Sequence, residues 1–209
     1  MSTRRTQAER RTQTRADLIA AARAQFAERG YAAVSLEEIV RAAGVTRGAL
    51  YHHFADKQDL FRTIVREIEQ EIDVRMLSTG GAELSGLERF RVAVRVFLEA
   101  CTQADVGRIL LIDGPSVLGW QEWREIDAAP TLRLIEDGLE ELAAHDWIAP
   151  QPFKPLAHLI YGALIEAGLY LATTSDPEKE LPQMHASLEH LLAATLGWRD
   201  SNSPSEPHD

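Results

Sequence analysis

The chain has one cysteine among its 209 residues, Cys101, which excludes an internal disulfide bond and a structural zinc site built on thiolates. Its longest apolar stretch, residues 156–172, is interrupted by His158 and Glu166 and is short for a membrane span. The first fifteen residues are polar and lack the apolar segment of a secretory signal. These absences predict a cytoplasmic protein that has no membrane partner.

Motifs for catalysis and for cofactor binding are also absent. The sequence contains no G-x-S-x-G, no phosphate-binding P-loop and no dinucleotide fingerprint. Its histidines do not form a metal-binding pair on a helix, since His52 and His53 are adjacent and His185 and His190 are five residues apart rather than four. We therefore predict no catalytic residue, no metal site and no cofactor, and a protein that is not an enzyme.

The charge is distributed unevenly along a chain whose net charge is −10. Residues 1–62 contain 11 Lys and Arg against 7 Asp and Glu, whereas residues 63–209 contain 11 against 25. Five arginines fall in the first fifteen positions: Arg4, Arg5, Arg10, Arg11 and Arg15. A basic end on an acidic body indicates that this end alone meets an anionic partner such as nucleic acid, or, alternatively, that the arginines form a solvated tail.

Hydrophobic residues recur at helical spacing along nearly the whole chain, without a convincing alternating run for a strand. The pattern predicts an all-α protein of about nine to ten helices. Asp113-Gly114-Pro115 is expected to end a helix, and residues 117–126 and 130–145 are expected to form two separate ones. Four segments are expected: a flexible basic arm over 1–14, a helix-turn-helix domain over 15–61, a larger helical domain over 62–198 and a disordered tail over 199–209.

Residues 35–57 combine a capped helix, a glycine turn and a short second helix. Ser35 followed by Glu38 gives an S-x-x-E capping box, and Thr46 is placed to cap the next helix. Gly44 allows the left-handed backbone of a tight turn. Apolar residues fill the angle between the two helices: Ile39, Ala43, Val45 and Leu50. This is the plan of a helix-turn-helix, although helix pairs with a glycine turn also occur in all-α proteins that do not bind DNA.

The string that begins at Ser35, SLEEIVRAAGVTRGALYHHFADKQDLF, closely resembles the signature of the TetR family of bacterial transcription regulators. The similarity covers about residues 16–61, and its core, G-V-T-x-G-x-L-Y-x-H-F-x-x-K-x-x-L, is a dense and specific pattern. The resemblance implies a three-helix DNA-binding domain that is joined through the fourth helix to a ligand-binding and dimerisation domain. It further implies a repressor that binds a palindromic operator as a homodimer and is released by a small effector.

Carried over by position, the resemblance assigns the DNA contacts to Ser35, Thr46, Arg47, Gly48, Tyr51, His52, His53 and Lys57. Arg47 has the forked donors that suit guanine or phosphate, and Tyr51 offers a hydroxyl for phosphate and a ring for a thymine methyl. Gly48 allows the helix backbone to come close to the duplex, and Lys57 matches the family's phosphate-contacting lysine. The N-terminal arginines form either an arm near the minor groove or a tail that adds non-specific attraction, and we favour the tail.

The last two long helices, residues 156–172 and 181–196, are expected by resemblance to form a four-helix interface between two copies of the chain. The first of them is apolar almost all round, which predicts deep burial, and it carries small residues that permit close helix contact: Gly162, Ala163, Ala167 and Gly168. The second carries a coiled-coil-like leucine stripe. The alternative is that both stripes belong to the core of a monomer.

The effector pocket is expected among the fourth to eighth helices, with six candidate lining residues: Phe97, Cys101, Trp120, Trp123, His158 and Tyr161. The two tryptophans, three residues apart, either line a cavity for an aromatic or lipophilic effector or pack in the core. Arg108, Asp113 and Glu166 either anchor a polar group of the effector or pair with one another in helix contacts.

Two other functions are alternatives to a ligand-controlled regulator. A helical, dimeric interaction protein would dimerise without affinity for DNA. A small all-α enzyme would need paired carboxylates, and no such pair stands out in the sequence. Arg47, Tyr51 and Lys57 discriminate among the three, because their replacement alters DNA binding only in the regulator.

Overall fold

The computed structural model of this chain describes residues 6–79 and 84–197. The described residues form nine α-helices, one π-helix and no strand, which confirms the predicted all-α class. In chain order the elements are α1 (Gln7–Arg29), α2 (Leu36–Ala42), α3 (Arg47–His53), α4 (Lys57–Thr79), α5 (Gly86–Cys101), the π-helix η1 (Val106–Asp113), α6 (Gly114–Leu118), α7 (Trp120–Ala144), α8 (Phe153–Thr173) and α9 (Pro177–Leu196).

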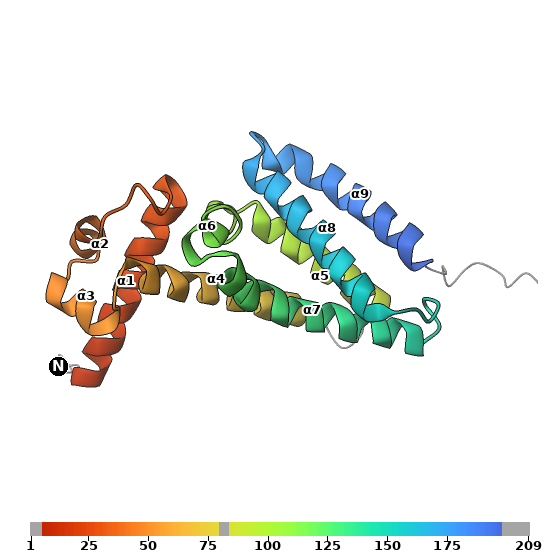
Figure 1. Cartoon of the computed structure of the whole chain (residues 1–209), viewed down its shortest axis with the longest axis horizontal. Helices are drawn as coiled ribbons and strands as arrows, with labels where there is room; N and C mark the ends of the chain where they lie inside the picture. The colour runs from red at the N-terminus through yellow and green to blue at the C-terminus, as the bar shows by residue number, and fades with distance from the viewer. Residues whose placement is uncertain (1–5, 80–83, 198–209) are drawn as a thin grey trace, which may run out of the picture.

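The helices form a small group at one end of the molecule and a larger bundle at the other (Figure 1). The small group consists of α1, α2 and α3, and α4 runs from it along the larger bundle of α5, α7, α8 and α9. One cluster of buried side chains extends through both groups, from Leu18 of α1 to Leu196 of α9. The two parts are therefore joined through a continuous core, and α4 belongs to both.

α1 begins earlier than the sequence indicated. It starts at Gln7, so the chain is helical over much of the segment 1–14 in which a flexible arm was expected. A capping box fixes this start: Thr6 N donates to the Glu9 carboxylate at 2.7 Å, and Glu9 N donates to Thr6 Oγ1 at 3.2 Å. The first two turns carry no apolar stripe, so periodicity gave no sign of them. The tail expected over 199–209 lies outside the described residues.

The chain between η1 and α7 corrects two further expectations. Helical structure does not end at Asp113-Gly114-Pro115, because η1 passes directly into α6 and Pro115 occupies the first turn, where its missing N–H is tolerated. α7 is one helix rather than two and contains Pro130. The actual break falls at Gly119, whose φ of 82° suits glycine. Packing holds α7 together across the proline, since its core-facing side chains are buried: Trp123, Ala128, Ile135 and Leu139.

α8 is less buried than its composition predicted. One side packs on the bundle, while Leu159 and Tyr170 on the other side keep 71% and 45% of their surface exposed. Gly162 and Glu166 are exposed as well. Among the described residues, α8 is the one helix that is long and apolar enough to span a membrane, judged by length and composition only. Of its most apolar 18 residues, 44% are buried inside the protein. The exposed side forms a stripe at helical spacing, which a second protein surface is able to cover.

Candidate nucleic-acid interface and effector cavity

Two capped helices and a glycine turn build the helix-turn-helix. Ser35 Oγ accepts a hydrogen bond from Glu38 N at 3.3 Å and so starts α2, and Thr46 Oγ1 accepts one from Ala49 N at 3.2 Å and so starts α3. Gly44 has a φ of 65° at the turn between them. Ile39 and Leu50 are fully buried in the angle of the two helices. The core therefore fixes the direction of α3 and decides which of its side chains face solvent.

The exposed face of α3 carries Arg47, Gly48, Tyr51 and His52. The Arg47 guanidinium lies 5.6 Å from the centre of the Tyr51 ring and donates to the Tyr51 hydroxyl at 3.4 Å. It also forms a salt bridge of 3.1 Å with Glu37 of α2. A nucleic acid must displace this exposed carboxylate, which is a small cost for a solvent-screened pair. The structure thus brings Arg47 and Tyr51 together as one polar ridge on the face predicted to meet DNA.

The two adjacent histidines of α3 lie in different surroundings. His52 is exposed, whereas His53 is half-buried and its ring packs near that of Phe54. Burial lowers the pKa of His53, and the neighbouring His52 lowers it further. His53 therefore adds little positive charge to this end of the molecule at neutral pH, and its assignment as a DNA contact stays a prediction.

Lys57 is turned toward the protein rather than toward solvent. Its Nζ donates to the carbonyl oxygen of Tyr31 at 2.5 Å and lies 4.0 Å from the centre of the Tyr31 ring. Burial lowers the pKa of the Lys57 ammonium. To reach a phosphate the side chain must leave this site, although its backbone already stands at the N-terminus of α4, where N–H groups attract anions. Its role as a phosphate contact stays a prediction.

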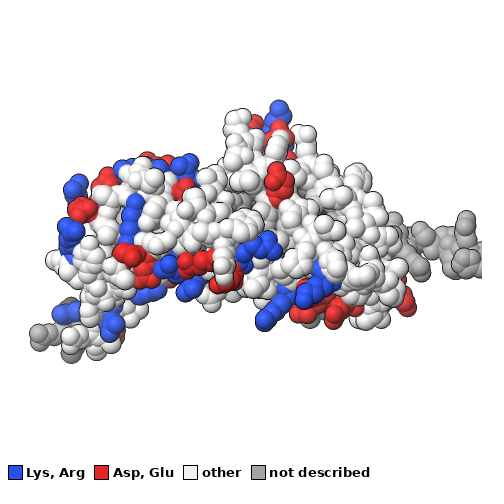
Figure 2. Space-filling view, in the orientation of Figure 1, with Lys and Arg blue, Asp and Glu red and all other residues white. Residues whose placement is uncertain are grey.

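Basic side chains extend from α3 onto α1. Figure 2 shows Lys and Arg spread over the end of the molecule that holds α1, α2 and α3, with acidic side chains among them. A surface groove of about 530 Å³ runs between α1 and α3 and is lined by Arg11, Arg15, His52 and His53 among others. Arg15 also pairs with Glu67 of α4 at 3.3 Å. The groove extends the basic surface beyond α3 and places α1 where it is able to follow a nucleic-acid backbone.

A small enclosed cavity of about 50 Å³ lies in the larger bundle, between α4, α5, α7 and α8. Most of its wall is apolar and includes Phe97, Leu134 and Leu164. Two buried acidic residues also line the cavity: Glu69 of α4 and Asp127 of α7, with 8% and 3% of their surface exposed. The hydroxyl of Tyr161 donates a hydrogen bond to Asp127 Oδ2. The cavity is thus apolar except at one acidic corner.

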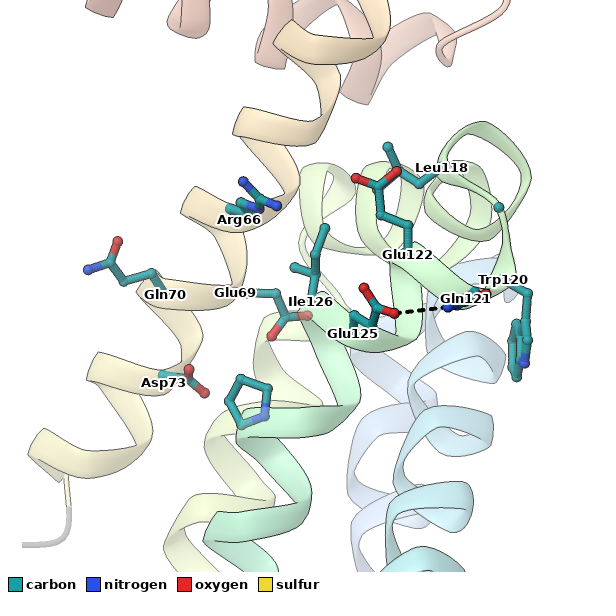
Figure 3. A pocket seen from close by; sticks show the side chains of 12 residues that line it. Arg66, Glu69, Gln70, Asp73, Leu118, Trp120, Gln121, Glu122, Glu125 and Ile126 are labelled. Atoms are coloured by element: carbon teal, nitrogen blue, oxygen red, sulfur yellow. Dashed lines mark hydrogen bonds between the residues drawn. The ribbon is translucent and has the colours of Figure 1, made fainter.

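An open cleft of about 790 Å³ lies next to this cavity, between α4 and the segment that begins α7 (Figure 3). Glu69 lines both spaces, so it stands between the cleft and the cavity. In Figure 3 Glu69 and Asp73 project from α4 toward α7, and Glu125 projects from α7 into the same space. Trp120 lies at the rim with 61% of its surface exposed. The described residues contain no group of three or more His, Cys, Asp and Glu side chains placed to hold a metal ion.

Two family models match successive parts of the chain. Residues 18–64 match the model described as bacterial regulatory proteins, tetR family, and residues 87–200 match a tetracyclin repressor-like C-terminal domain. An HTH-type transcriptional repressor from Mycobacterium tuberculosis is 35% identical over 167 residues, which cover 79% of this chain and 86% of that protein. The chain belongs to the TetR family.

Solved structures share this arrangement of helices over most of the chain. A TetR-family regulator from Pectobacterium atrosepticum has a TM-score of 0.75 and 36% identity, over 92% of this chain and 98% of that one. A gamma-butyrolactone receptor described as ArpA-like has a TM-score of 0.65 and 25% identity, over 88% of each chain. As a TetR-family member this chain is a DNA-binding transcription regulator and not an enzyme, as the sequence predicted.

The six predicted effector contacts of this TetR-family chain lie in different places. Phe97 and Tyr161 line the enclosed cavity, and Trp120 lines the open cleft. The other three line neither space: Cys101 is buried beside Gly168, Trp123 is buried and donates from Nε1 to the Leu110 carbonyl at 2.9 Å, and His158 is exposed on α8. The ring centres of the two tryptophans are 5.2 Å apart, but Trp120 lines a cleft whereas Trp123 packs in the core.

Sequence reasoning missed the acidic corner formed by Glu69 and Asp127. Burial raises the pKa of Glu69 well above its ordinary value, and the nearby Asp127 raises it further. Burial also raises the pKa of Asp127. A signal was present, because Glu69 interrupts the apolar stripe of Val65, Ile72 and Met76 on α4 at helical spacing. A carboxyl on the buried side of a helix, with a strongly shifted pKa, is a candidate for a function beyond packing.

The raised pKa predicts how the Glu69→Gln substitution changes stability. The folded protein keeps a proton on Glu69 that the unfolded chain releases, so the wild type loses stability as pH rises from the ordinary carboxyl pKa through the raised one. Glutamine does not ionise and escapes this loss. We expect the free energy of unfolding of the variant, relative to wild type, to rise as the pH increases above the ordinary carboxyl pKa.

Urea denaturation at several pH values measures this difference. Glu67→Gln is the matched control, because Glu67 lies on the same helix but is more exposed and pairs with Arg15. If the difference in free energy of unfolding between Glu69→Gln and wild type does not change with pH, the assignment of a raised pKa to Glu69 is wrong.

Proposed function

We propose that this chain is a cytoplasmic repressor that binds a palindromic operator as a homodimer through α3 and is released by a small apolar or aromatic effector. The observation that carries the proposal is the exposed face of α3, where Arg47 and Tyr51 project from a helix whose direction the core fixes. The similar Mycobacterium tuberculosis protein is described as a repressor, which supports repression rather than activation. We place the boundary between the DNA-binding and effector domains inside α4, near residue 61.

The dimer interface is proposed on the exposed sides of α8 and α9. Leu159 and Tyr170 of α8 and Leu191 of α9 keep 71%, 45% and 52% of their surface exposed in one chain. A Cβ added at Gly162 meets nothing within 4 Å, so this glycine leaves room for a partner helix. Covering such a stripe with a second copy removes apolar surface from water and places two recognition helices on one operator.

Leu159→Arg is expected to separate the two copies. The arginine places a charge in the centre of the proposed interface, where it has no partner and is removed from water. Size-exclusion chromatography with light scattering should give the mass of two 23.3 kDa chains for wild type and of one for the variant. We expect operator affinity to fall about 100-fold or more, because a single recognition helix makes half of the contacts.

Val74→Arg is the control for this experiment, because Val74 is an aliphatic residue of α4 with 58% of its surface exposed and lies outside the proposed interface. It should leave the mass and the operator affinity unchanged. A Leu159→Arg variant that remains dimeric rules out this surface, and a monomeric wild type that binds the operator tightly rules out the proposed dimeric mechanism.

Several contacts connect the effector side of the molecule to the DNA-binding side, among them the salt bridge of 2.7 Å between Arg23 of α1 and Asp105. Tyr31 N donates to Asp113 Oδ2 at 2.7 Å, and Gln58 Nε2 donates to the Val117 carbonyl at 2.6 Å. Arg62 of α4 donates to the carboxylate of Glu122 at the start of α7. An effector that moves α7 relative to α4 therefore acts on the orientation of α1, α2 and α3. It does so by binding one arrangement of the helices more tightly than the other.

Lys57→Ala is expected to weaken binding to operator and to random duplex alike. A phosphate contact carries no sequence information, and its loss should reduce the slope of log K against log salt concentration by about 1 for each chain bound. Fluorescence anisotropy at several salt concentrations gives the slope. Lys154→Ala, which removes an exposed lysine at the start of α8, should leave it unchanged. An unaltered slope in Lys57→Ala shows that the lysine stays on Tyr31 in the complex.

A further inference from the structure

The acidic corner of the enclosed cavity contains a polar atom that the protein leaves without a partner. The Glu69 and Asp127 carboxyl groups share a hydrogen bond, but no donor of the described residues reaches the buried Glu69 Oε1, and the side chain lines the cavity. Tyr161 satisfies Asp127 on the opposite side of the corner. A buried polar atom without a partner is costly, and proteins keep one chiefly where another molecule supplies the missing bond.

Several titratable groups lie around the two carboxyl groups of this corner or belong to it. They are Asp73 on α4, Cys101 on α5, Arg124 and Asp127 on α7, and Tyr161 on α8. Arg124 lowers the pKa of Asp127, but its guanidinium lies over the rings of Trp120 and Tyr161, at 5.7 and 5.4 Å from their centres. In the described part of the chain neither Glu69 nor Asp127 forms a salt bridge. In the described residues the corner therefore has two buried carboxyl groups and no cationic side chain in a salt bridge with either of them.

The open cleft leads a ligand to the same corner. Asp73 and Glu125 line the cleft, and Glu69 forms the wall that it shares with the cavity. Glu122 is already paired with Arg62, so it does not attract a further cation. Trp120 lies at the rim, where the Arg124 guanidinium already lies over its ring, and its exposed surface suits an apolar group. Glu69, Asp73 and Glu125 outnumber Arg66, the basic side chain of this lining, so the charge of the cleft favours a positively charged ligand over a negative one.

We propose that this cavity binds a small cationic amphiphile, with its protonated nitrogen beside Glu69 and Asp127 and its apolar body among the side chains of α5 and α8. The proposal rests on the proposed function, since it names the chemical class of the effector. An anionic ligand adds a negative charge beside two acidic groups, and a ligand without a hydrogen-bond donor leaves Glu69 Oε1 unsatisfied. A protonated nitrogen supplies both the donor and the counter-charge.

The size of the cavity links this binding to regulation. About 50 Å³ holds little more than water, so an amphiphile enters only if α4 and α7 move apart. The same two helices carry Arg62 and Glu122, which join the effector side to the DNA-binding side. Binding therefore favours the arrangement in which this junction is opened.

The test compares three ligands that share an eight-carbon chain and differ in head group: octylamine, 1-octanol and octanoate. Isothermal titration calorimetry on the full chain without DNA measures their affinities at neutral pH. Octylamine should bind about tenfold or more tighter than octanol, and octanoate should bind most weakly. Because a cation stabilises the ionised carboxyl, octylamine should also release protons, which appears as a dependence of the measured heat on the ionisation enthalpy of the buffer.

Glu69→Gln and Glu67→Gln distinguish a specific site from general attraction. Glu69→Gln should lose most of the preference for octylamine over octanol and most of the proton release, while Glu67→Gln should keep both. Circular dichroism confirms that each variant is folded. The proposal is overturned if wild type shows no preference for the amine, if it binds none of the three at millimolar concentration, or if Glu69→Gln keeps the preference. DNA is absent from this assay, so failure of the operator experiments does not affect its result.

Discussion

Replacing Arg47 and Tyr51 together by alanine should lower operator affinity about 100-fold or more, which corresponds to about 3 kcal/mol. Arg47 provides the forked donor of α3, and Tyr51 holds its guanidinium through a ring contact and a hydroxyl. Both are exposed and outside the core, so the double variant should remain as stable as wild type. Affinity for random duplex should fall much less, because phosphate contacts elsewhere persist.

Fluorescence anisotropy with the operator and with a scrambled duplex measures both effects. Arg133→Ala is the matched control, since it removes an exposed arginine of α7 far along the chain from α3. If the double variant binds the operator as wild type does, α3 does not read the bases and the assignment of the recognition helix is wrong. If Arg133→Ala causes an equal loss, the effect is one of net charge only.

Phe26→Ala should destabilise the protein by about 3–5 kcal/mol, the usual cost of removing a fully buried aromatic ring. Phe26 has no exposed surface, and its ring centre lies 5.5 Å from those of both Tyr31 and Phe61. This aromatic cluster joins α1 to α4 and supports the backbone carbonyl that holds Lys57. The loss should therefore fall first on α1, α2 and α3, and operator binding should fail at temperatures where the larger bundle is still folded.

Thermal unfolding followed by circular dichroism, together with operator binding at increasing temperature, tests this expectation. Phe153→Ala is the control, because Phe153 is only half-buried at the start of α8 and should cost much less. A single unfolding transition with full operator binding up to that temperature would contradict the expected local effect.

The helix-turn-helix was predictable because its determinants are local. The Ser35 and Thr46 caps, the turn at Gly44 and the apolar residues around Leu50 act over a few positions, and the structure shows each in its expected place. The start of α1 at Gln7 was not predictable from periodicity, because a polar first turn carries no apolar stripe and depends on a cap. The continuity of α7 across Pro130 was not predictable either, because packing against helices that are distant in the sequence outweighs the local tendency of proline to end a helix.

The effector site depends still more on tertiary structure. Phe97 and Tyr161 line the cavity of the larger bundle, and their role as effector contacts stays a prediction, whereas Cys101 and Trp123 are buried away from it. Spacing along a helix gives the side that is buried, but it does not say where neighbouring helices leave a space between them. Glu69 gains its unusual environment only when the folded bundle buries it and α7 brings Asp127 beside it.

Selection of random duplex DNA by the purified wild-type chain, followed by sequencing of the bound pool, tests the central claim most directly. The account predicts enrichment of a palindrome with two half-sites, since two α3 helices related by two-fold symmetry read two copies of one sequence. The same selection with the Arg47 and Tyr51 double variant should give no such enrichment. If folded wild-type protein enriches no sequence at low salt, the chain does not act through sequence-specific DNA binding and the proposed repressor mechanism is wrong.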